Sequence, residues 1–125
     1  MLQNILLISL GAIAGANLRY FVAQLVSRLI PSNFPYGTLV INFSASFILG
    51  LFLIWTGERV IVDPRWRLLI AVGFCGGYST YSSFAFETFA LMEQGRWMLF
   101  ASNIILMNVL CLMGVALGAA AARSI

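Results

Sequence analysis

The stretch that decides the fold is Gly73-Phe74-Cys75-Gly76-Gly77-Tyr78-Ser79-Thr80-Tyr81-Ser82-Ser83-Phe84, a glycine pair followed by a run of hydroxyl residues. It lies within an otherwise apolar segment that is long enough to cross a membrane. Adjacent glycines weaken a helix. In hydrocarbon, irregular backbone survives only where it is buried in protein or lines a cavity. The stretch therefore predicts a membrane helix that is broken between Gly76 and Thr80, with an ion site at the break.

The composition is that of an integral membrane protein. Of the 125 residues, 62% are hydrophobic and 9% are charged, and the mean hydropathy is +0.98. No soluble domain needs so much apolar sequence to fill one core. At about 20 apolar residues per span, the length fits four transmembrane helices with short connections. We therefore expect one all-α transmembrane domain over residues 1–125.

Turn and cap residues divide the chain into spans. Pro31-Ser32-Asn33 ends the first span, and Pro35 suits the first turn of the second. Asp63-Pro64 has the pattern of an N-cap followed by a proline at the first helical position, which opens the third. The first span is too long for a signal-peptide core, so we expect it to be retained. The expected spans are residues 3–30, 35–56, 65–94 and 97–122, in a multi-pass protein of the cell membrane.

Charge and residue types exclude several classes of function. The net charge of +3 comes from scattered arginines without a basic run, so the sequence has no basic cluster that would indicate nucleic-acid binding. The chain has no histidine, and Cys75 and Cys111 lie in apolar spans, where cysteines are most often small packing residues. We expect no enzyme, because the sequence offers no nucleophile with a base and no cluster of metal-binding side chains.

The distribution of arginines bears on orientation. With four spans, both termini lie on one side of the membrane. That side would carry Arg59, Arg65, Arg67 and Arg123, and the other side Arg28 and Arg96. The difference in positive charge between the two sides of a membrane protein sets its orientation. Because this difference is slight here, the chain could insert in either orientation. Dual topology implies an antiparallel homodimer, which we take as a hypothesis.

Two pairs of glycines have the spacing of close helix contacts. They are Gly11 with Gly15 in the first span, and Gly114 with Gly118 in the fourth. Such spacing allows two membrane helices to approach closely. The partner helix of each pair could belong to the same chain or to a second chain.

Polar residues recur at helical spacing in the second and third spans. Thr38, Asn42 and Ser46 share one helix face, and Ser79, Ser83 and Glu87 share another. These two rows could face one pathway. A buried asparagine such as Asn42 could simply tie two helices together. Its amide could equally donate to an anion in a narrow path.

Two charged residues and two aromatic residues also have alternative explanations. Glu87 is a candidate proton relay, or a hydrogen-bonded group near a vestibule. Arg19 could reach the membrane interface, or draw anions into a vestibule. Tyr81 and Phe84 share a helix face just after the break. Such pairs usually pack, although a ring edge carries positive potential that weakly stabilises a bare anion.

Three motifs carry a family resemblance. They are Gly15-Ala16-Asn17-Leu18-Arg19-Tyr20, then Pro35-Tyr36-Gly37-Thr38-Leu39 followed by Asn42, and the stretch 73–84 followed by Glu87. Through them nearly the whole chain resembles the Fluc family of fluoride channels, also called CrcB-type fluoride exporters. The resemblance implies a dual-topology homodimer of four-helix subunits in a bacterial or archaeal cytoplasmic membrane. Its two pores would pass fluoride and largely exclude chloride, so that cytoplasmic fluoride leaves passively.

The resemblance also implies site residues. A structural sodium ion at the dimer centre would be held by the backbone carbonyls of Gly76 and Ser79 from each subunit. Oxygen ligands suit a hard cation, and an unwound span provides them. We expect the fluoride pathway to include Asn42, Tyr81, Phe84, Thr38, Ser82 and Ser83, with Arg19 and Glu87 in a vestibule.

The chain departs from the family pattern at several of these positions. Tyr81 stands where phenylalanine is usual, and adds a hydroxyl donor and acceptor. Ser79 replaces a common threonine, a milder change because the expected ligand is a backbone carbonyl. Met107 and Cys111 occupy positions in the fourth span where relatives often have polar groups.

Two other functions remain open at the level of sequence. One is a proton-coupled small multidrug-type exporter, which would use Glu87 as its coupling group. The other is a scaffold or assembly protein that transports nothing, in which the glycine break would be structural.

Overall fold

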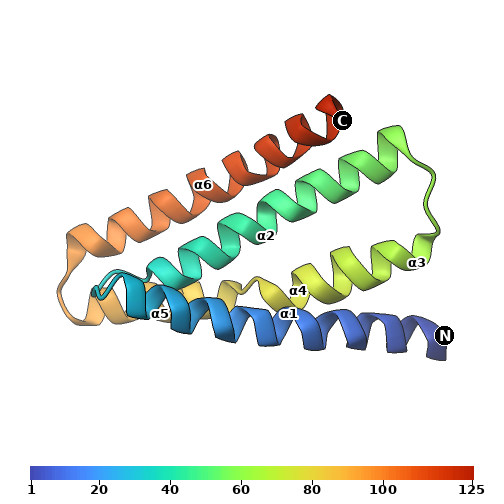
Figure 1. Cartoon of the computed structure of the whole chain (residues 1–125). Helices are drawn as coiled ribbons and strands as arrows, with labels where there is room; N and C mark the ends of the chain where they lie inside the picture. Colours follow the sequence, from blue (N-terminus) through green and yellow to red (C-terminus); the bar gives the residue numbers. More distant parts are fainter.

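The chain runs back and forth along one direction as antiparallel helical passes (Figure 1). This computed structural model describes residues 1–58 and 60–125 in full, and residue 59 by its backbone alone. The elements in chain order are α1 (Leu2–Leu29), α2 (Tyr36–Ile54), the π-helical η1 (Trp55–Arg59), α3 (Pro64–Trp66), the π-helical η2 (Arg67–Cys75), α4 (Gly76–Tyr78), α5 (Tyr81–Glu93) and α6 (Trp97–Ser124).

Three helices are long and apolar enough to cross a membrane. They cover Leu2–Leu29, Tyr36–Glu58 and Trp97–Ser124, and lie over three of the four expected spans. At 1.5 Å per residue, a 28-residue helix such as α1 is about 42 Å long, against a hydrocarbon core of about 30 Å. The number, length and composition of these helices are those of a multi-pass membrane protein.

The third pass, expected over 65–94, is made of shorter helices. Asp63 caps its start, because its side chain accepts a hydrogen bond from the Arg65 N–H at 2.9 Å, and Pro64 takes the first helical position. The helix continues to Tyr78, and the chain then becomes extended at Ser79 (φ −76°, ψ 160°) and Thr80 (φ −153°, ψ 119°). The third pass is therefore interrupted, at the end of the interval where we expected the break.

The cause of the break differs from our expectation. We expected the glycine pair to interrupt the helix, but Gly76 and Gly77 both lie in α4. Gly77 instead allows close packing: a Cβ there would lie 2.6 Å from the carbonyl oxygen of Ala12 on α1. The interruption comes two residues later, where hydrogen bonds to side chains replace the backbone hydrogen bonds of the helix.

The glycine pairs of the first and fourth spans pack within the chain. A Cβ at Gly11 or Gly15 would collide with the backbone of η2 and α4, and one at Gly118 would collide with the backbone of α2 at Phe47. A Cβ at Gly114 would lie 2.9 Å from the carbonyl oxygen of Phe43 on α2. Of the two alternatives left by the sequence, these spacings therefore serve contacts inside the subunit.

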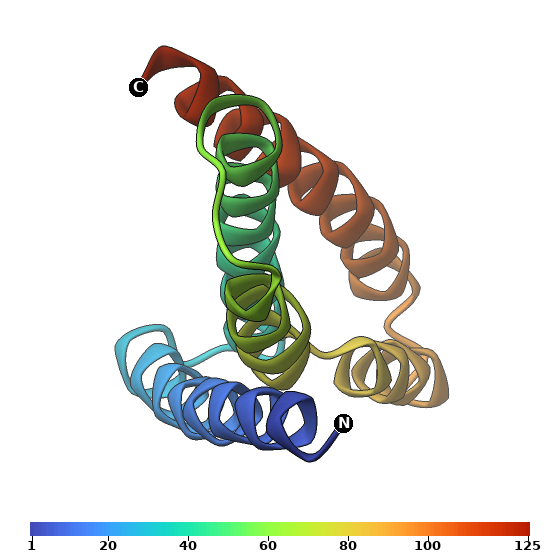
Figure 2. The same cartoon turned by 90° about the vertical axis from the view of Figure 1, so that its right-hand side faces the viewer.

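The break shifts the third pass sideways. Figure 2 shows η2 and α4 against α1, while α5 lies beside the beginning of α6. α2 contacts both halves of the third pass and lies along α6. The break thus faces α2, which carries the polar row predicted from the sequence.

The two termini follow the expected arrangement. Both termini and the connection before α3 lie at the same end of the molecule (Figure 1). At that end, Arg123 donates to both carboxylate oxygens of Glu58, at 2.9 and 3.0 Å. The side chain of Arg59, which we assigned to this end, lies outside the described residues.

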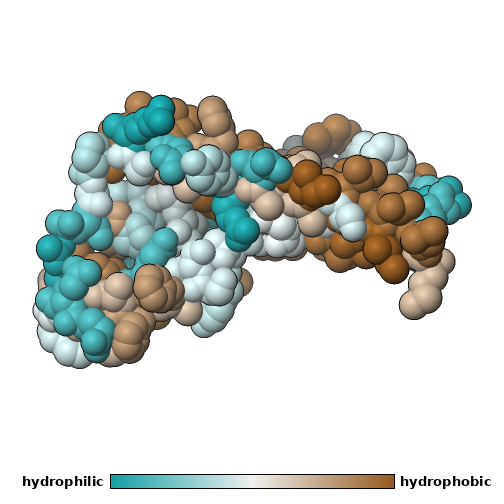
Figure 3. All heavy atoms as spheres, turned by 90° about the horizontal axis from the view of Figure 1, so that it is seen from below, coloured by the Kyte–Doolittle hydropathy of each residue, from teal (hydrophilic) through white to brown (hydrophobic). Residues whose placement is uncertain are grey.

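Much of the surface is apolar. Side chains such as Leu6, Leu10 and Ile13 on α1 and Leu112 on α6 are exposed, each by more than half. On the face seen in Figure 3, apolar side chains dominate one half, while the other half mixes hydrophilic and apolar side chains. Patches of this extent are typical of surfaces that face lipid or another protein.

Candidate functional site

Asn42 holds the interrupted backbone of the third pass. Its Nδ2 donates to the carbonyl oxygen of Thr80 at 2.9 Å, and its Oδ1 accepts from the Thr80 N–H at 2.8 Å. Both residues are buried. Unpaired backbone groups are costly in a membrane interior. One amide side chain from α2 therefore supplies the donor and the acceptor that the extended residue lost when the helix ended.

Thr80 then begins α5 as its N-cap. Its Oγ1 accepts from the Ser83 N–H at 3.2 Å, the usual bond of a capping hydroxyl to the third helical residue. The same hydroxyl lies 3.1 Å from the Ser83 Oγ and 3.3 Å from the Ser82 Oγ. The hydroxyl run predicted from the sequence thus forms a small network that fixes the start of α5.

These bonds release two carbonyls. In an uninterrupted helix, the N–H of residue 80 would bond to the carbonyl of Gly76, and the N–H of residue 83 to that of Ser79. Here the Thr80 N–H bonds to Asn42 and the Ser83 N–H bonds to Thr80 Oγ1. Gly76 is exposed, and a Cβ added to it would meet no atom of the described part of the chain within 4 Å. The carbonyl of Gly76 has therefore lost its helical donor on an open face of the chain.

An open cleft of about 340 Å³ lies beside the break, and we call it the break cleft. Its lining residues are Asn42, Ser46, Ser79, Thr80, Tyr81, Phe84, Met107, Asn108, Cys111, Leu112 and Val115. Tyr81 and Phe84 meet edge to face, with ring centroids 5.4 Å apart at 67°. Tyr81 is 78% exposed and Phe84 only 6%. The cleft thus combines amide, hydroxyl and aromatic groups from α2, α5 and α6.

One hydrogen of the Asn42 amide is only weakly used. After the bond to Thr80, the remaining contact of Nδ2 is the Met107 sulfur at 3.5 Å. The Cys111 Sγ lies 3.8 Å from the same sulfur. A thioether is a weak acceptor. The side chains of α6 at this point therefore compete only weakly with an approaching anion for the Asn42 N–H.

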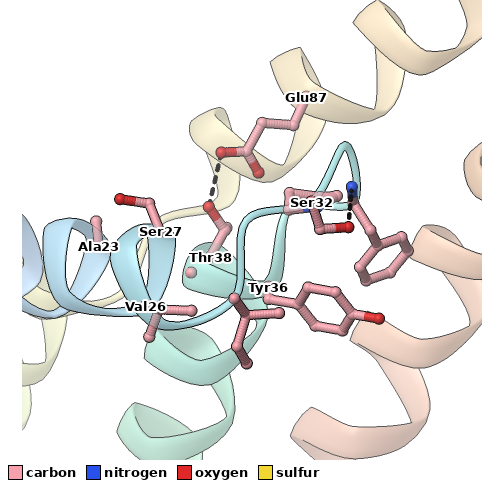
Figure 4. A pocket seen from close by; sticks show the side chains of 11 residues that line it. Ala23, Val26, Ser27, Ser32, Tyr36, Thr38 and Glu87 are labelled. Carbon is pink, nitrogen blue, oxygen red and sulfur yellow. Dashed lines mark hydrogen bonds between the residues drawn. The ribbon is translucent and has the colours of Figure 1, made fainter.

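A second cleft of about 240 Å³ lies at the end of the molecule that carries the α1–α2 connection, and we call it the mouth cleft. Its lining residues are Ala23, Val26, Ser27, Ile30, Ser32, Phe34, Pro35, Tyr36, Gly37, Thr38 and Glu87. Figure 4 shows the Thr38 hydroxyl pointing to the Glu87 carboxylate, where Oγ1 donates to Oε1 at 2.7 Å. The other oxygen, Oε2, is buried without a partner among the described residues.

The polar row of α2 connects the two clefts. Thr38 lines the mouth cleft, and Asn42 and Ser46 line the break cleft. Between them, Phe84 packs in an apolar cluster with Phe34 and Met107, next to Leu39. The structure therefore brings Asn42, Tyr81 and Phe84 together as expected, and places Thr38 with Glu87 one helical turn away.

The remaining predicted residues have other positions. Ser82 and Ser83 lie with their hydroxyls within 3.3 Å of the Thr80 hydroxyl, at the start of α5. Arg19 is half-buried on α1, one turn after Gly15, and lines neither cleft. The structure thus brings Glu87 to the mouth cleft without Arg19.

Sequence reasoning missed a second polar contact of α5. Asn103 on α6 is fully buried, and its Nδ2 donates to the Thr88 Oγ1 at 2.9 Å. The Thr88 hydroxyl in turn donates to the carbonyl oxygen of Phe84 at 2.6 Å. This chain of bonds fixes the half of α5 that carries Phe84. An asparagine in an apolar span was the available signal, because such a residue needs a partner.

The chain is similar to proteins of one family. Residues 6–119 match the family described as CrcB-like protein, Camphor Resistance (CrcB). A protein of Koribacter versatilis named fluoride-specific ion channel FluC is 51% identical over 99% of this chain and 98% of its own length. Proteins of the same name are 43% identical in Rhodospirillum rubrum, over 90% of this chain and 89% of theirs, and 42% in Coxiella burnetii, over 98% and 100%. These names describe ion channels and not enzymes.

Proposed function

The chain belongs to the CrcB-like protein family, and from this membership and the break cleft we propose that it is a channel through which fluoride leaves the cell passively. Its relatives in Koribacter versatilis and Rhodospirillum rubrum are called fluoride-specific ion channels. The membrane would be the cytoplasmic membrane of a bacterium or archaeon. The proposed pathway follows the polar row of α2 through both clefts.

The observation that carries this proposal is the Asn42 amide. Fluoride is strongly hydrated, so a dry pore must replace its water with other donors without forming a deep well. The amide is fixed by two bonds to Thr80, while its second hydrogen faces only a sulfur atom at 3.5 Å. The rings of Tyr81 and Phe84 line the same cleft, where a ring edge turned to the anion would add weak positive potential. Several weak contacts of this kind suit a small anion in transit.

The driving force needs no coupled ion. A membrane potential that is negative inside pushes an anion outward, worth about 2.3 kcal/mol per 100 mV for each elementary charge. Undissociated hydrofluoric acid would enter the cell and ionise at cytoplasmic pH. The channel would then drain the trapped anion and lower its toxic concentration.

The proposal includes an antiparallel homodimer of four-span subunits with two pores and a structural sodium ion. The carbonyls of Gly76 and Ser79 fit such an ion, because the donors that would bond to them in a helix are held elsewhere. Hard cations prefer oxygen ligands of this kind. Two carbonyls from each chain would give four ligands. When bound, the ion would supply a fixed positive charge and a link between the subunits.

The experiment that tests the function is efflux from liposomes that contain the purified protein. A fluoride electrode measures release after a potassium ionophore is added, and a matched assay measures chloride. We expect rapid release of fluoride with little release of chloride. A folded protein that releases neither anion would contradict the channel, and would favour the proton-coupled exporter or the scaffold protein.

A further inference from the structure

We propose that Asn42 and Thr80 are positioning residues of the cation site. Their side chains accept hydrogen bonds from two backbone N–H groups. In a continuous helix, these N–H groups would instead donate to the carbonyls of Gly76 and Ser79. This inference rests on the structural sodium ion of the proposed function. It explains how the two carbonyls stay free of helical hydrogen bonds. The glycines next to the break do not explain this, because they are helical.

Asn42 performs the first step. Its Oδ1 lies 2.8 Å from the Thr80 nitrogen, which is the nitrogen that would donate to the Gly76 carbonyl in a continuous helix. Both Asn42 and Thr80 are buried, so water does not offer a ready replacement for this acceptor. Without Oδ1, the Thr80 N–H recovers a partner most directly by bonding to Gly76. That change would occupy the carbonyl that the cation needs.

Thr80 performs the second step. Its Oγ1 accepts from the Ser83 N–H at 3.2 Å, and this N–H would otherwise reach the Ser79 carbonyl. Two separate side-chain acceptors therefore release two carbonyls three residues apart. Loss of either acceptor would therefore impair the same cation site through a different carbonyl.

The arrangement also links the two ion sites. The Oδ1 of Asn42 controls the Gly76 carbonyl, while its Nδ2 faces the break cleft next to Met107. Substitution of Asn42 is therefore expected to change both anion flux and cation binding. Substitution of the Thr80 hydroxyl is expected to change cation binding through Ser79.

The test compares the unfolding temperature of the purified protein in sodium chloride with that in N-methylglucamine chloride at equal ionic strength. The retention of radioactive sodium after gel filtration is a second readout. We expect wild-type protein to be more stable in sodium, and Thr80→Val to lose more than half of that difference and most of the retained sodium. Thr80→Ser, which keeps the hydroxyl acceptor, should restore both.

A matched control separates this effect from general destabilisation. Thr56 is a buried threonine in η1, well away from the break, and its hydroxyl bonds to the Phe52 carbonyl at 2.8 Å. Thr56→Val should lower the unfolding temperature in both salts and leave the difference between them unchanged. Asn42→Leu tests the other carbonyl, that of Gly76, and does not depend on whether Thr80→Val folds. It should also abolish the difference in unfolding temperature between the two salts.

The outcomes distinguish this inference from the proposed function. If wild-type protein is stabilised by sodium and both Thr80→Val and Asn42→Leu keep the full difference, the positioning roles are wrong while the cation site stands. If wild-type protein conducts fluoride but binds no sodium and gains no stability from it, the cation site and this inference both fail, and the channel remains.

Discussion

Asn42 has two amide hydrogens and one carbonyl oxygen, and three hydrogen bonds engage them in this fold. The sequence left two roles open for this residue, a tie between helices and a donor to an anion. The geometry supports the first role directly, through the paired bonds with Thr80. It is compatible with the second, because the bond to the Met107 sulfur is weak. Its place in the fluoride pathway stays a prediction.

We predict that Asn42→Asp suppresses fluoride flux by at least about tenfold. A carboxylate about 4 Å from a passing anion repels it by about 4 kcal/mol at an effective dielectric constant of about 20. The measurement is efflux from liposomes, with gel filtration to show that the variant is folded. Asn4→Asp, the same change at an exposed position near the start of α1, should conduct normally. Unchanged flux in Asn42→Asp would remove this residue from the pathway.

Glu87 separates a channel from a proton-coupled exporter. We predict that Glu87→Gln keeps fluoride efflux within a factor of about three, because glutamine retains an acceptor for the Thr38 hydroxyl and removes only the titratable group. Glu93→Gln, at the exposed end of α5, is the matched control and should behave like wild type. Complete loss of transport in Glu87→Gln alone would support the exporter.

Helical periodicity correctly predicted the shared face of α2, but not which residues that face contacts. It was wrong for Ser79, which is extended and precedes α5, and so does not share a helix face with Ser83 and Glu87. Spacing placed Thr38, Asn42 and Ser46 on one face, and the family resemblance associated Asn42 with the aromatic pair. The partners of these groups could not be predicted, because the bond between Thr38 and Glu87 joins residues 49 positions apart and depends on how the passes pack.

At the scale of elements, the break in the third pass shows why local propensity was only partly informative. Glycine weakens a helix through its flexibility. However, Gly73 and Gly77 lie in helical segments, and both pack so closely on α1 that a Cβ at either position would collide with its backbone. The helix ends where tertiary contacts replace its bonds. The position of the break was therefore predictable to within a few residues, and its cause was not.

We predict that Gly77→Ala destabilises the subunit by about 1–3 kcal/mol, the usual cost of overpacking. The new Cβ would lie 2.6 Å from the Ala12 carbonyl oxygen and 2.9 Å from its Cα, both backbone atoms that cannot move without shifting α1. The measurement is the free energy of unfolding in detergent. Gly57→Ala is the control, since among the described side chains its Cβ would meet only the end of Arg67, at 3.8 Å. Equal stability of the two variants would contradict the tight contact.

At the scale of the whole molecule, both termini lie at one end and the charge bias between the two ends is small. The rule that relates positive charge to orientation then gives no strong preference. We predict that a reporter fused to the C-terminus is found on both sides of the membrane in comparable amounts. Accessibility of a tag from each side measures this. A C-terminus confined to one side would exclude dual topology and the antiparallel dimer with it.

Gly76 offers a test of the dimer that leaves the subunit intact. Among the described residues of its own chain, a Cβ at Gly76 would meet nothing within 4 Å, and alanine is favoured over glycine in a helix by about 0.5–1 kcal/mol. Gly76→Ala should therefore not destabilise an isolated subunit. If Gly76 lies on the two-fold axis of an antiparallel dimer, however, two added methyl groups would meet there and separate the carbonyls of the cation site.

We therefore predict that Gly76→Ala weakens dimerisation and lowers the retention of sodium, while the helical content and the unfolding of the subunit stay as in wild type. Energy transfer between labelled subunits at increasing dilution in lipid measures the dimer. Gly57→Ala again serves as the control, because its position lies in η1, before the start of the third pass and away from the break. A dimer as tight as that of wild type, with sodium retained, would place the two-fold contact elsewhere on the apolar surface.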